Sequence, residues 1–509
     1  AEYGELQGKI QRLDKSRKDF RERLSAEALD AQALIWPGDR DPLDVVLRRT
    51  RALVQHYRRT GALPAERLAR AEAELARLTE SAKAAAPGPA VPEGADGDNR
   101  LKGRARVRKK PSAGFAADPR SRLFLDVCAL RRRLAFANPL LNFDSIVCML
   151  EQPGNARIIE QARACFPGHV AGGGPVLLRN FKGDLDAQPL LKGAAVSDGP
   201  WQGKELTGKF SGLELTYDAD ELLFAATTDA DVWHVFRFKL GDRRLAQLTD
   251  GPCDDFDPYL LPSGRIVFTS TRRGGIGRCL LTPKSLTYTL YSMEGDGGDV
   301  VPLSYHETNE WAPVVTHDGK IAYTRWDYVD RHWGTAHHYW ECYPDGRDPR
   351  NFHGNYPLPY WAIPEGVQPE QYGQRALVHG RFLRPDVEIS FRPIGGSHKL
   401  TATAVGHHEG FSGSLVLLDP RVPDDGRMAQ LKRITPEYFF PEVEPGGAHA
   451  YGTAWPLSED FYLCNFQTGL YLLDRYGNRE LIYESPDSRF RVRDPFPLRS
   501  RPRPPVLPV

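Results

Sequence analysis

Residues 257–270, DPYLLPSGRIVFTS, and residues 312–325, APVVTHDGKIAYTR, carry the same pattern. Each segment has a proline at its second position, then a Ser-Gly or Asp-Gly turn, a basic residue and an alternating apolar strand. A weaker copy, LELTYDADELLFA, runs over residues 213–225, and the period is roughly 50 residues. A strand–turn–strand unit that recurs at this period is typical of the blades of a β-propeller.

The remaining strand and turn signals extend this pattern along the chain. Apolar alternation, with glycine and asparagine turns between the strands, predicts six blades and leaves a seventh open. The segments lie near residues 141–180, 210–250, 254–303, 309–350, 386–435 and 448–485. We therefore predict a mainly β fold, a six- or seven-bladed β-propeller that follows an α-helical N-terminal region.

The pattern divides the chain into four parts. Residues 1–83 read as helices, because apolar residues recur at helical spacing. Residues 84–118 form a Pro/Gly/Ala-rich and basic linker. The propeller is expected to span residues 119–490 and to begin with a helix at 121–137. Residues 491–509 form a Pro/Arg-rich tail, which should be extended because proline cannot continue a helix.

The charge balance argues against a dedicated nucleic-acid protein. The 509 residues include 67 basic and 66 acidic side chains, whereas nucleic-acid-binding domains are usually basic throughout. The linker stretch KGRARVRKK at 102–110 is either a patch for an anionic surface or a solvated arm. No aromatic residue interleaves its charges, which favours the arm. We expect no nucleic-acid partner.

No apolar run approaches the roughly 20 residues that are needed to cross a bilayer, so no membrane span is expected. The chain begins in polar helical sequence without a secretory signal, which is compatible with a processed mature form or with a cytoplasmic protein. Its seven cysteines are scattered, with no CxxC and no CxxCH. This spacing predicts neither a zinc ribbon nor a covalently attached c-type haem.

Histidines, carboxylates and tryptophans concentrate in residues 304–343, and a second group lies at 406–409. Imidazoles with a carboxylate suit zinc, copper or iron, and loops of adjacent blades can meet at one mouth of a propeller. Two neighbouring histidines on a strand point to opposite faces, so each His-His pair supplies one ligand to one site. The candidate metal ligands in these two groups are His306, Glu310, His337, His338, His407 and His408.

Two other interpretations of these residues remain open. The side chains can form hydrogen-bonded networks between blades, with Trp326 packed between two blades and Asp327 capping a turn. They can also line a pocket for an organic ligand, in which tryptophans stack and an arginine contacts an anion. The candidate ligand-binding residues are Trp311, Arg325, Trp326, Asp327 and Arg331. No catalytic residue is assigned.

From about residue 118 onward, the sequence resembles the middle-domain family of the hydrazine synthase alpha subunit, a family of planctomycete-type bacteria with a TolB-like repeat. The longest segments that carry the resemblance are FANPLLNFDSIV at 136–147, QLTDGPCDDFDPYLLPSGRIVFTSTRRGG at 247–275 and PLSYHETNEWAPVVTHDGKIAYTRWDYVDR at 302–331. Shorter ones are GSLVLLDPRVPDDG at 413–426, YGTAWPLSEDFYLC at 451–464 and YLLDRYGNREL at 471–481.

The resemblance implies a propeller in the periplasm or another extracytoplasmic space, packed against a haem-containing partner domain or subunit. It also implies a thiolate that binds zinc near the haem, for which Cys279 is the candidate in this chain. The cofactor would be zinc or another transition metal, and haem only where another domain or subunit supplies it. Hydrazine synthase activity itself is not expected, because the sequence has no CxxCH motif.

These observations favour a binding or scaffolding module that forms part of a larger extracytoplasmic assembly. The helices in residues 1–82 are a candidate oligomer interface. The alternative is a metal- or haem-dependent redox enzyme with its site at the propeller mouth. Whether the chain is an enzyme is left open by the sequence.

Overall fold

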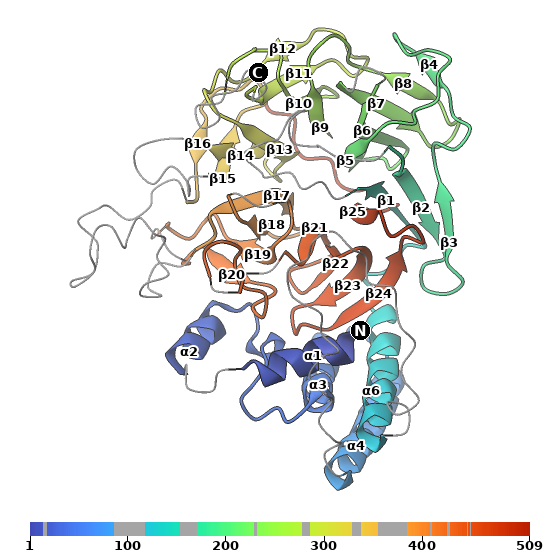
Figure 1. The fold of residues 1–509 in the computed structure, drawn as a ribbon, viewed down its shortest axis with the longest axis vertical. Coiled ribbons are helices and arrows are strands. Elements are labelled where there is room, and N and C mark those ends of the chain that lie inside the picture. Colours follow the sequence, from blue (N-terminus) through green and yellow to red (C-terminus); the bar gives the residue numbers. More distant parts are fainter. Residues whose placement is uncertain are drawn as a thin grey trace, which may run out of the picture. The chain divides into compact units, whose positions relative to one another are not determined.

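The structure is a computed structural model, and Figure 1 shows its course. It describes residues 1–13, 18–85, 118–152, 171–228, 232–276, 286–327, 337–354, 384–407, 410–424, 428–444, 446–447 and 449–508. The chain divides into two compact units, which are taken in turn. The first comprises Ala1–Asn142, Ile434–Glu437 and Leu472–Glu480, and the second holds the rest.

The first unit is built from helices. They are α1 (Glu2–Gln11), α2 (Lys18–Glu27), the short η1 (Ala31–Ala33), α3 (Pro42–Thr60), α4 (Ala65–Ala84) and α6 (Pro119–Phe136). The Asp41 side chain caps the first turn of α3, and Gly61 ends that helix with a φ of 64°, as is common at helix termini. Helices α3, α4 and α6 pack against one another.

Two buried arginines are paired with carboxylates inside this unit. Arg131 of α6 lies 2.7 Å from Glu2 and 2.6 Å from Glu480. Arg120, at the start of the same helix, binds both Asp41 and Asp44. A buried guanidinium must be paired, because losing one partner would leave an uncompensated charge. These ion pairs therefore attach α6 to other parts of the helical unit.

The second unit is mainly β and has a propeller-like arrangement of sheets (Figure 1). One sheet has the order β25 (Arg491–Pro497), β1 (Ser145–Glu151), β2 (Gly174–Arg179) and β3 (Asp186–Pro189). The next has the order β4 (Val196–Asp198), β8 (Leu245–Gln247), β7 (Trp233–Lys239), β6 (Glu221–Thr227) and β5 (Phe210–Leu215). A third has the order β12 (Val301–Pro302), β11 (Thr289–Met293), β10 (Ile266–Ser270) and β9 (Asp255–Leu260).

The largest sheet contains two four-strand runs. The first run is β13 (Glu310–Val315), β14 (Ile321–Trp326), β15 (His337–Cys342) and β16 (Arg350–Asn351). The second is β17 (Val387–Pro393), β18 (Leu400–Val405), β19 (Ser414–Leu418) and β20 (Leu431–Arg433). A single parallel pair, His337 opposite Val387, joins the two runs. The last sheet holds β21 (Tyr451–Pro456), β22 (Phe461–Phe466), β23 (Gly469–Asp474) and β24 (Arg479–Glu484).

The strands β25, β5, β9, β13, β17 and β21 contact one another in a closed cycle, in that order. We call them the inner strands. Each shows a shift in its pairing register, the mark of a β-bulge. Five of the bulges contain a residue with positive φ, namely Gly212, Asp257, Ala312, Ser390 and Asp494. The repeat in residues 257–270 and 312–325 is therefore the bulged inner strand and its hairpin partner.

Side chains at the bulges bond neighbouring inner strands together. The Ala312 amide donates to Asp257 Oδ2 over 3.1 Å, and the Leu213 amide donates to Asp494 Oδ2 over 3.3 Å. The Asp494 amide donates in turn to Thr453 Oγ1 over 2.7 Å. Proline is tolerated beside the bulges of β9, β13 and β25 because each of these inner strands is the edge strand of its sheet and pairs with one neighbour only.

The predicted class, a mainly β propeller-like fold with N-terminal helices, is confirmed. The division of the chain differs from the predicted boundaries in three places, and in the first of these Ile434–Glu437 and Leu472–Glu480 belong to the helical unit. Helix α6 belongs to the helical unit, because its apolar face packs on α3 and α4. Residues 491–497 are the inner strand β25 and not a tail, since β25 pairs with β1. Residues 86–117 of the predicted linker lie outside the described part.

Replacing Phe496 by alanine tests whether β25 is part of the folded core. Its ring is 1% exposed and lies 4.8 Å from that of Trp455. The cavity should lower the free energy of unfolding by about 3–5 kcal/mol, measured as a lower urea midpoint. Val506→Ala is the control, since Val506 is 62% exposed and should change stability by less than about 0.5 kcal/mol. Equal, small effects of both changes would contradict the placement of β25.

Candidate functional site

The polar residues singled out from the sequence gather around β13, β14, β15 and β17. His337 and His338 begin β15, and their side chains take different neighbours, as strand alternation requires. His337 contacts His407. His338 contacts Glu388, because the parallel pair of His337 with Val387 sets the next residues of the two strands side by side. One bridge between the two strand runs of this sheet thus brings His338 and Glu388 together.

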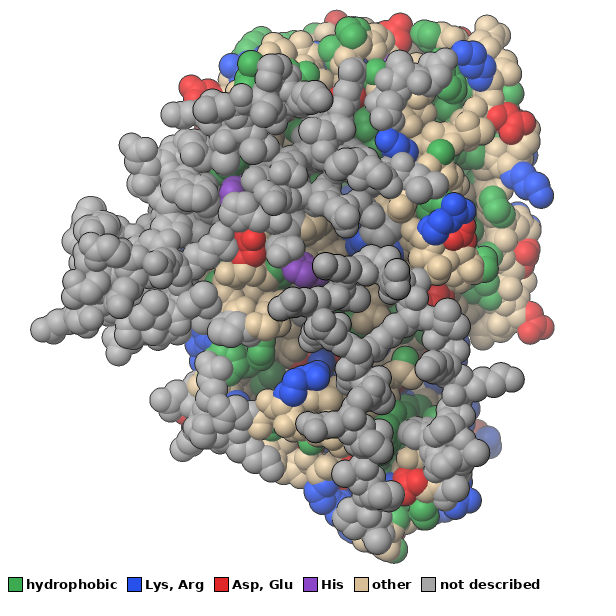
Figure 2. Space-filling view, viewed as in Figure 1, with side chains coloured by type: hydrophobic (Ala, Val, Ile, Leu, Met, Phe, Trp, Pro, Cys, Tyr) green, Lys and Arg blue, Asp and Glu red, His purple; other side chains and the backbone are tan. Residues whose placement is uncertain are grey.

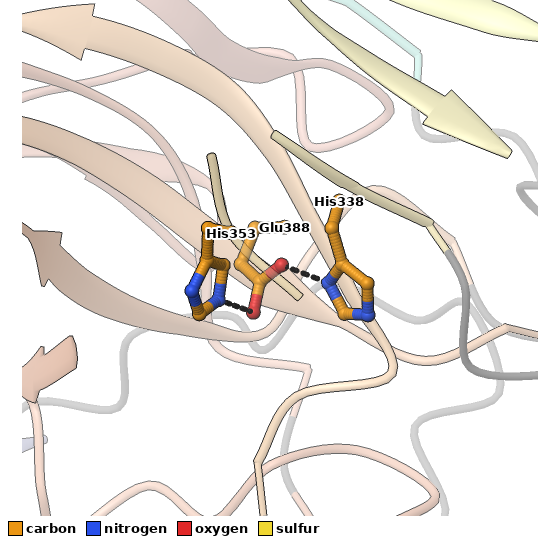
Figure 3. Close-up of side chains that lie close together, drawn as sticks. All are labelled: His338, His353 and Glu388. Atoms are coloured by element: carbon orange, nitrogen blue, oxygen red, sulfur yellow. Dashed lines mark hydrogen bonds and ion pairs between the residues drawn. The ribbon is translucent and has the colours of Figure 1, made fainter. Parts of the chain in front are cut away.

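We call His338, His353 and Glu388 the His–Glu cluster (Figure 3). His338 Nδ1 contacts Glu388 Oε2, and His353 Nε2 lies 3.3 Å from Glu388 Oε1. One nitrogen of each ring and one carboxylate oxygen all lie within 4.8 Å of one another. All three side chains are fully buried. The two imidazoles therefore approach the two oxygens of one carboxylate, as Figure 3 shows.

Neighbouring groups hold each member of the cluster. His353 Nδ1 lies 2.7 Å from Gln430 Oε1, and the Gln430 amide nitrogen donates to the Phe352 carbonyl over 2.8 Å. The Glu388 carbonyl accepts a bond from Thr324 Oγ1 over 2.7 Å. Gly354, with a φ of 82°, packs so closely that a Cβ there would overlap the ring of His338. The positions of the three side chains are therefore fixed by their surroundings.

The charges of the cluster follow from burial and mutual contact. Burial raises the pKa of Glu388, but the two imidazoles offset it and hold that pKa well below its usual range. Burial lowers the pKa of His338, and the attraction of Glu388 does not restore it. For His353 burial acts in the same direction, yet Glu388 prevails and raises the pKa. Glu388 is thus a carboxylate, and His338 is the neutral ring.

A second group is aromatic. The rings of Trp326 and His337 stack with centroids 4.8 Å apart, and the rings of Trp311 and His337 stack at 5.8 Å. His407 completes it, with its Nδ1 3.2 Å from His337 Nε2. All four residues are buried, so they are core packing between β14, β15 and the end of β18, in line with the interpretation of Trp326 as a residue between blades.

A third group surrounds Glu310, the first residue of β13. Glu310 accepts bonds from the Leu290 amide over 3.0 Å and from Ser304 Oγ over 2.9 Å. Burial raises the pKa of Glu310 to about 7. Burial and the nearby Arg325 lower the pKa of His306 to about 4. At neutral pH this group therefore holds a neutral imidazole and a carboxyl group near the midpoint of its titration.

A pocket of about 400 Å³ opens beside this third group. Ser304, His306, Tyr323 and Arg325 are among its lining residues. Arg325 donates to Asp327 over 3.1 Å, and its guanidinium lies 4.2 Å from the ring centre of Trp340. The pocket is thus lined by aromatic rings and by one cationic side chain, Arg325, which is already paired with Asp327.

The structure places the predicted site residues in three groups and not in one. His338 lies in the His–Glu cluster, while His337, His407, Trp311 and Trp326 lie in the aromatic group. His306, Glu310, Arg325 and Asp327 surround or adjoin the pocket. Three predicted residues, His408, Arg331 and Cys279, lie outside the described residues.

Sequence reasoning missed His353, Glu388 and Gln430. The sequence does contain a signal for Glu388. Consecutive inner strands carry an acidic residue two positions before the bulge residue with positive φ, namely Asp255, Glu310 and Glu388. All three carboxylates are buried, and a buried carboxylate needs a partner. His353 and Gln430 stand in no motif, because the fold and not the spacing brings them together.

Replacing Glu310 by glutamine tests the raised pKa. The pKa of Glu310 is 4.5 in the unfolded chain and about 7 in the folded one. The protonated carboxyl group therefore stabilises the fold fully below pH 4.5, and this contribution is lost as the pH rises through 7. The variant escapes this loss, so its stability relative to wild type should rise by up to about 3 kcal/mol between pH 4.5 and 8, measured by urea unfolding. The exposed Glu307→Gln is the control. Parallel pH profiles of Glu310→Gln and wild type would contradict the assignment.

Comparison with known proteins supports the fold. No protein-family profile and no curated protein matches the chain. Among solved structures, Kuenenia stuttgartiensis hydrazine synthase is similar at 14% identity with a TM-score of 0.52, over 72% of this chain and 48% of that one. TolB from Acinetobacter baumannii follows at 12% identity and a TM-score of 0.41, over 74% and 73% of the two chains. A putative TolB from Agrobacterium tumefaciens has 11% identity and a TM-score of 0.30, over 69% and 97%.

The present chain spans about half the length (48%) of the hydrazine synthase chain that it matches. At 14% identity the match establishes a shared fold and no shared chemistry. Among the helices of the described residues, none is long and apolar enough to cross a membrane. The resemblance to hydrazine synthase that the sequence suggested is thus confirmed as a likeness of fold.

Proposed function

We propose that this chain is a β-propeller binding or scaffolding module in a larger extracytoplasmic assembly. One observation carries the proposal: the fold is similar to part of a hydrazine synthase chain, and the match covers 48% of that chain. A fold that occurs as one region of a longer chain suits a module that positions other domains or subunits. A haem-containing partner and an oligomer contact through the N-terminal helices belong to the same proposal.

We propose that the propeller of this module has six blades. The closed cycle of six inner strands supports this number. The runs β13–β16 and β17–β20 then count as two blades, although one parallel pair joins them. Long loops on such a ring commonly carry binding residues, because the sheets hold them in fixed positions.

The pocket beside Ser304 and Arg325 is the proposed contact for a ligand or partner. Tyr305 lines it and is 72% exposed, and tyrosine is enriched where binding energy is concentrated. Figure 2 shows Lys/Arg and Asp/Glu side chains interspersed over the coloured part of one face. Among the residues coloured there, no large single-sign field marks a nucleic-acid surface, so a protein or small-molecule partner is proposed.

A metal-dependent redox enzyme is the second candidate. The observation that favours it is the His–Glu cluster, which brings two imidazoles and a carboxylate within 4.8 Å of one another. Hydrazine synthase activity is not proposed, because similarity of fold does not transfer chemistry.

Affinity purification of the tagged chain from its own cells, after chemical crosslinking and cell fractionation, tests the module proposal. The chain should come from the extracytoplasmic fraction and carry a second polypeptide in fixed stoichiometry. Tyr305→Ala should weaken that association by about tenfold or more, since interface tyrosines often contribute over 1.4 kcal/mol.

Val300→Ala is the matched control, because Val300 is also exposed, at 37%, and directly precedes β12, close to Tyr305 in the chain. The control should keep the association unchanged. A chain that is monomeric after crosslinking, or one confined to the cytoplasmic fraction, would count against the proposal.

A further inference from the structure

We propose that His338, His353 and Glu388 bind a divalent transition-metal ion of the Zn²⁺ or Fe²⁺ class. The inference rests on the geometry of the buried cluster and does not depend on the module proposal. Gln430 is assigned as a positioning residue for His353. His337, although adjacent to His338, is assigned no part in this site.

The donor set matches the chemistry of these ions. Two imidazoles and one glutamate, with a further position left open, are the ligands of a class of catalytic zinc sites and of two-histidine, one-carboxylate iron sites. Ligand atoms bound about 2.0–2.2 Å from a tetrahedral ion lie about 3.3 Å from one another. His353 Nε2 and Glu388 Oε1 are 3.3 Å apart, a separation that suits two ligands of one ion as well as a direct hydrogen bond.

In its neutral form, His353 turns the lone pair of Nε2 toward the carboxylate. The Gln430 amide nitrogen donates to the Phe352 carbonyl, which leaves Oε1 of Gln430 as the acceptor for His353 Nδ1. Nδ1 of His353 therefore carries the proton, and in the neutral ring Nε2 is the unprotonated nitrogen. A metal-binding histidine typically donates its other N–H in this way.

An unprotonated Nε2 that faces a carboxylate oxygen is repelled unless a cation lies between the two atoms. Two cations can fill that role: a proton, which makes His353 an imidazolium, or a metal ion. Among the described residues, one cation and one anion bind the backbone beside the cluster: Arg384 donates to the Gly354 carbonyl over 2.7 Å, and Asp424 accepts from the Gly354 amide over 2.7 Å. The choice between proton and metal is therefore what the experiment must decide.

The position of His338 is built into the backbone. Gly354 lies so close to the ring of His338 that any side chain at residue 354 would displace that ring. Its φ of 82° is a conformation that glycine adopts without strain. The approach of a backbone to the ring restricts the motion of His338, and a metal site needs ligands held in place before the ion arrives.

The test uses the purified full chain. Freed of metal with a chelator, it is equilibrated separately with Zn²⁺, with Co²⁺ and, without oxygen, with Fe²⁺, passed through a desalting column and analysed by mass spectrometry. Wild type should retain about one equivalent of at least one ion and should unfold at a higher temperature with it, because binding to the folded state stabilises it. The Co²⁺ form should show a visible spectrum of nitrogen and oxygen ligands without a thiolate band.

His338→Gln and Glu388→Gln should each lose the ion, while the matched control His337→Gln, one residue along β15, should keep it. Gln430→Leu should weaken binding by about 10–100-fold while keeping the stoichiometry. Circular dichroism confirms that each variant is folded. Less than about a tenth of an equivalent of every ion on folded wild type would overturn the proposal, and so would loss of the ion from folded His337→Gln but not from folded His338→Gln.

Discussion

Three consecutive inner strands each bury a carboxylate two residues before the bulge, and each of these carboxylates must be satisfied inside the protein. Asp255 is paired with Arg272 at 2.8 Å and with Ser270 at 2.6 Å. Glu310 has no such ion pair at hydrogen-bond distance among the described contacts, and its pKa is raised to about 7 by burial. Glu388 has two imidazoles. At the same position of the repeat, one carboxylate is thus paired with an arginine, one has a raised pKa and one is paired with two imidazoles. The candidate sites are built on the last two.

The bulges explain why these positions recur. Hydrogen bonds from Ala312 to Asp257 and from Leu213 to Asp494 bond adjacent inner strands. Because β25 pairs with β1, the first and last strands of the second unit lie in one sheet. Closure of this kind leaves the residue two positions before each bulge buried between sheets, where a charged side chain survives only with a partner.

The repeat in the sequence was enough to predict the class of fold, because Pro–turn–strand spacing depends on local geometry alone. The inner strand β25 was missed, since Pro495 and Pro497 argue against a strand and only an edge position tolerates them. Strand alternation separated His337 from His338 correctly. The partners of His338 could not be predicted from spacing, because His353 and Glu388 lie 15 and 50 positions further along the chain. Glu388 reaches His338 through the bridge between β15 and β17, and His353 follows β16, which pairs with β15.

In the proposed site a metal ion, and not a proton, joins the two imidazoles to Glu388. The most direct measurement is a crystal structure of the full chain grown with Zn²⁺, with anomalous data collected on both sides of the zinc absorption edge. An anomalous peak is expected within bonding distance, about 2.0–2.2 Å, of His338, His353 and Glu388. Ordered density for all three side chains, with His353 bonded directly to Glu388 and no peak between them, would contradict it.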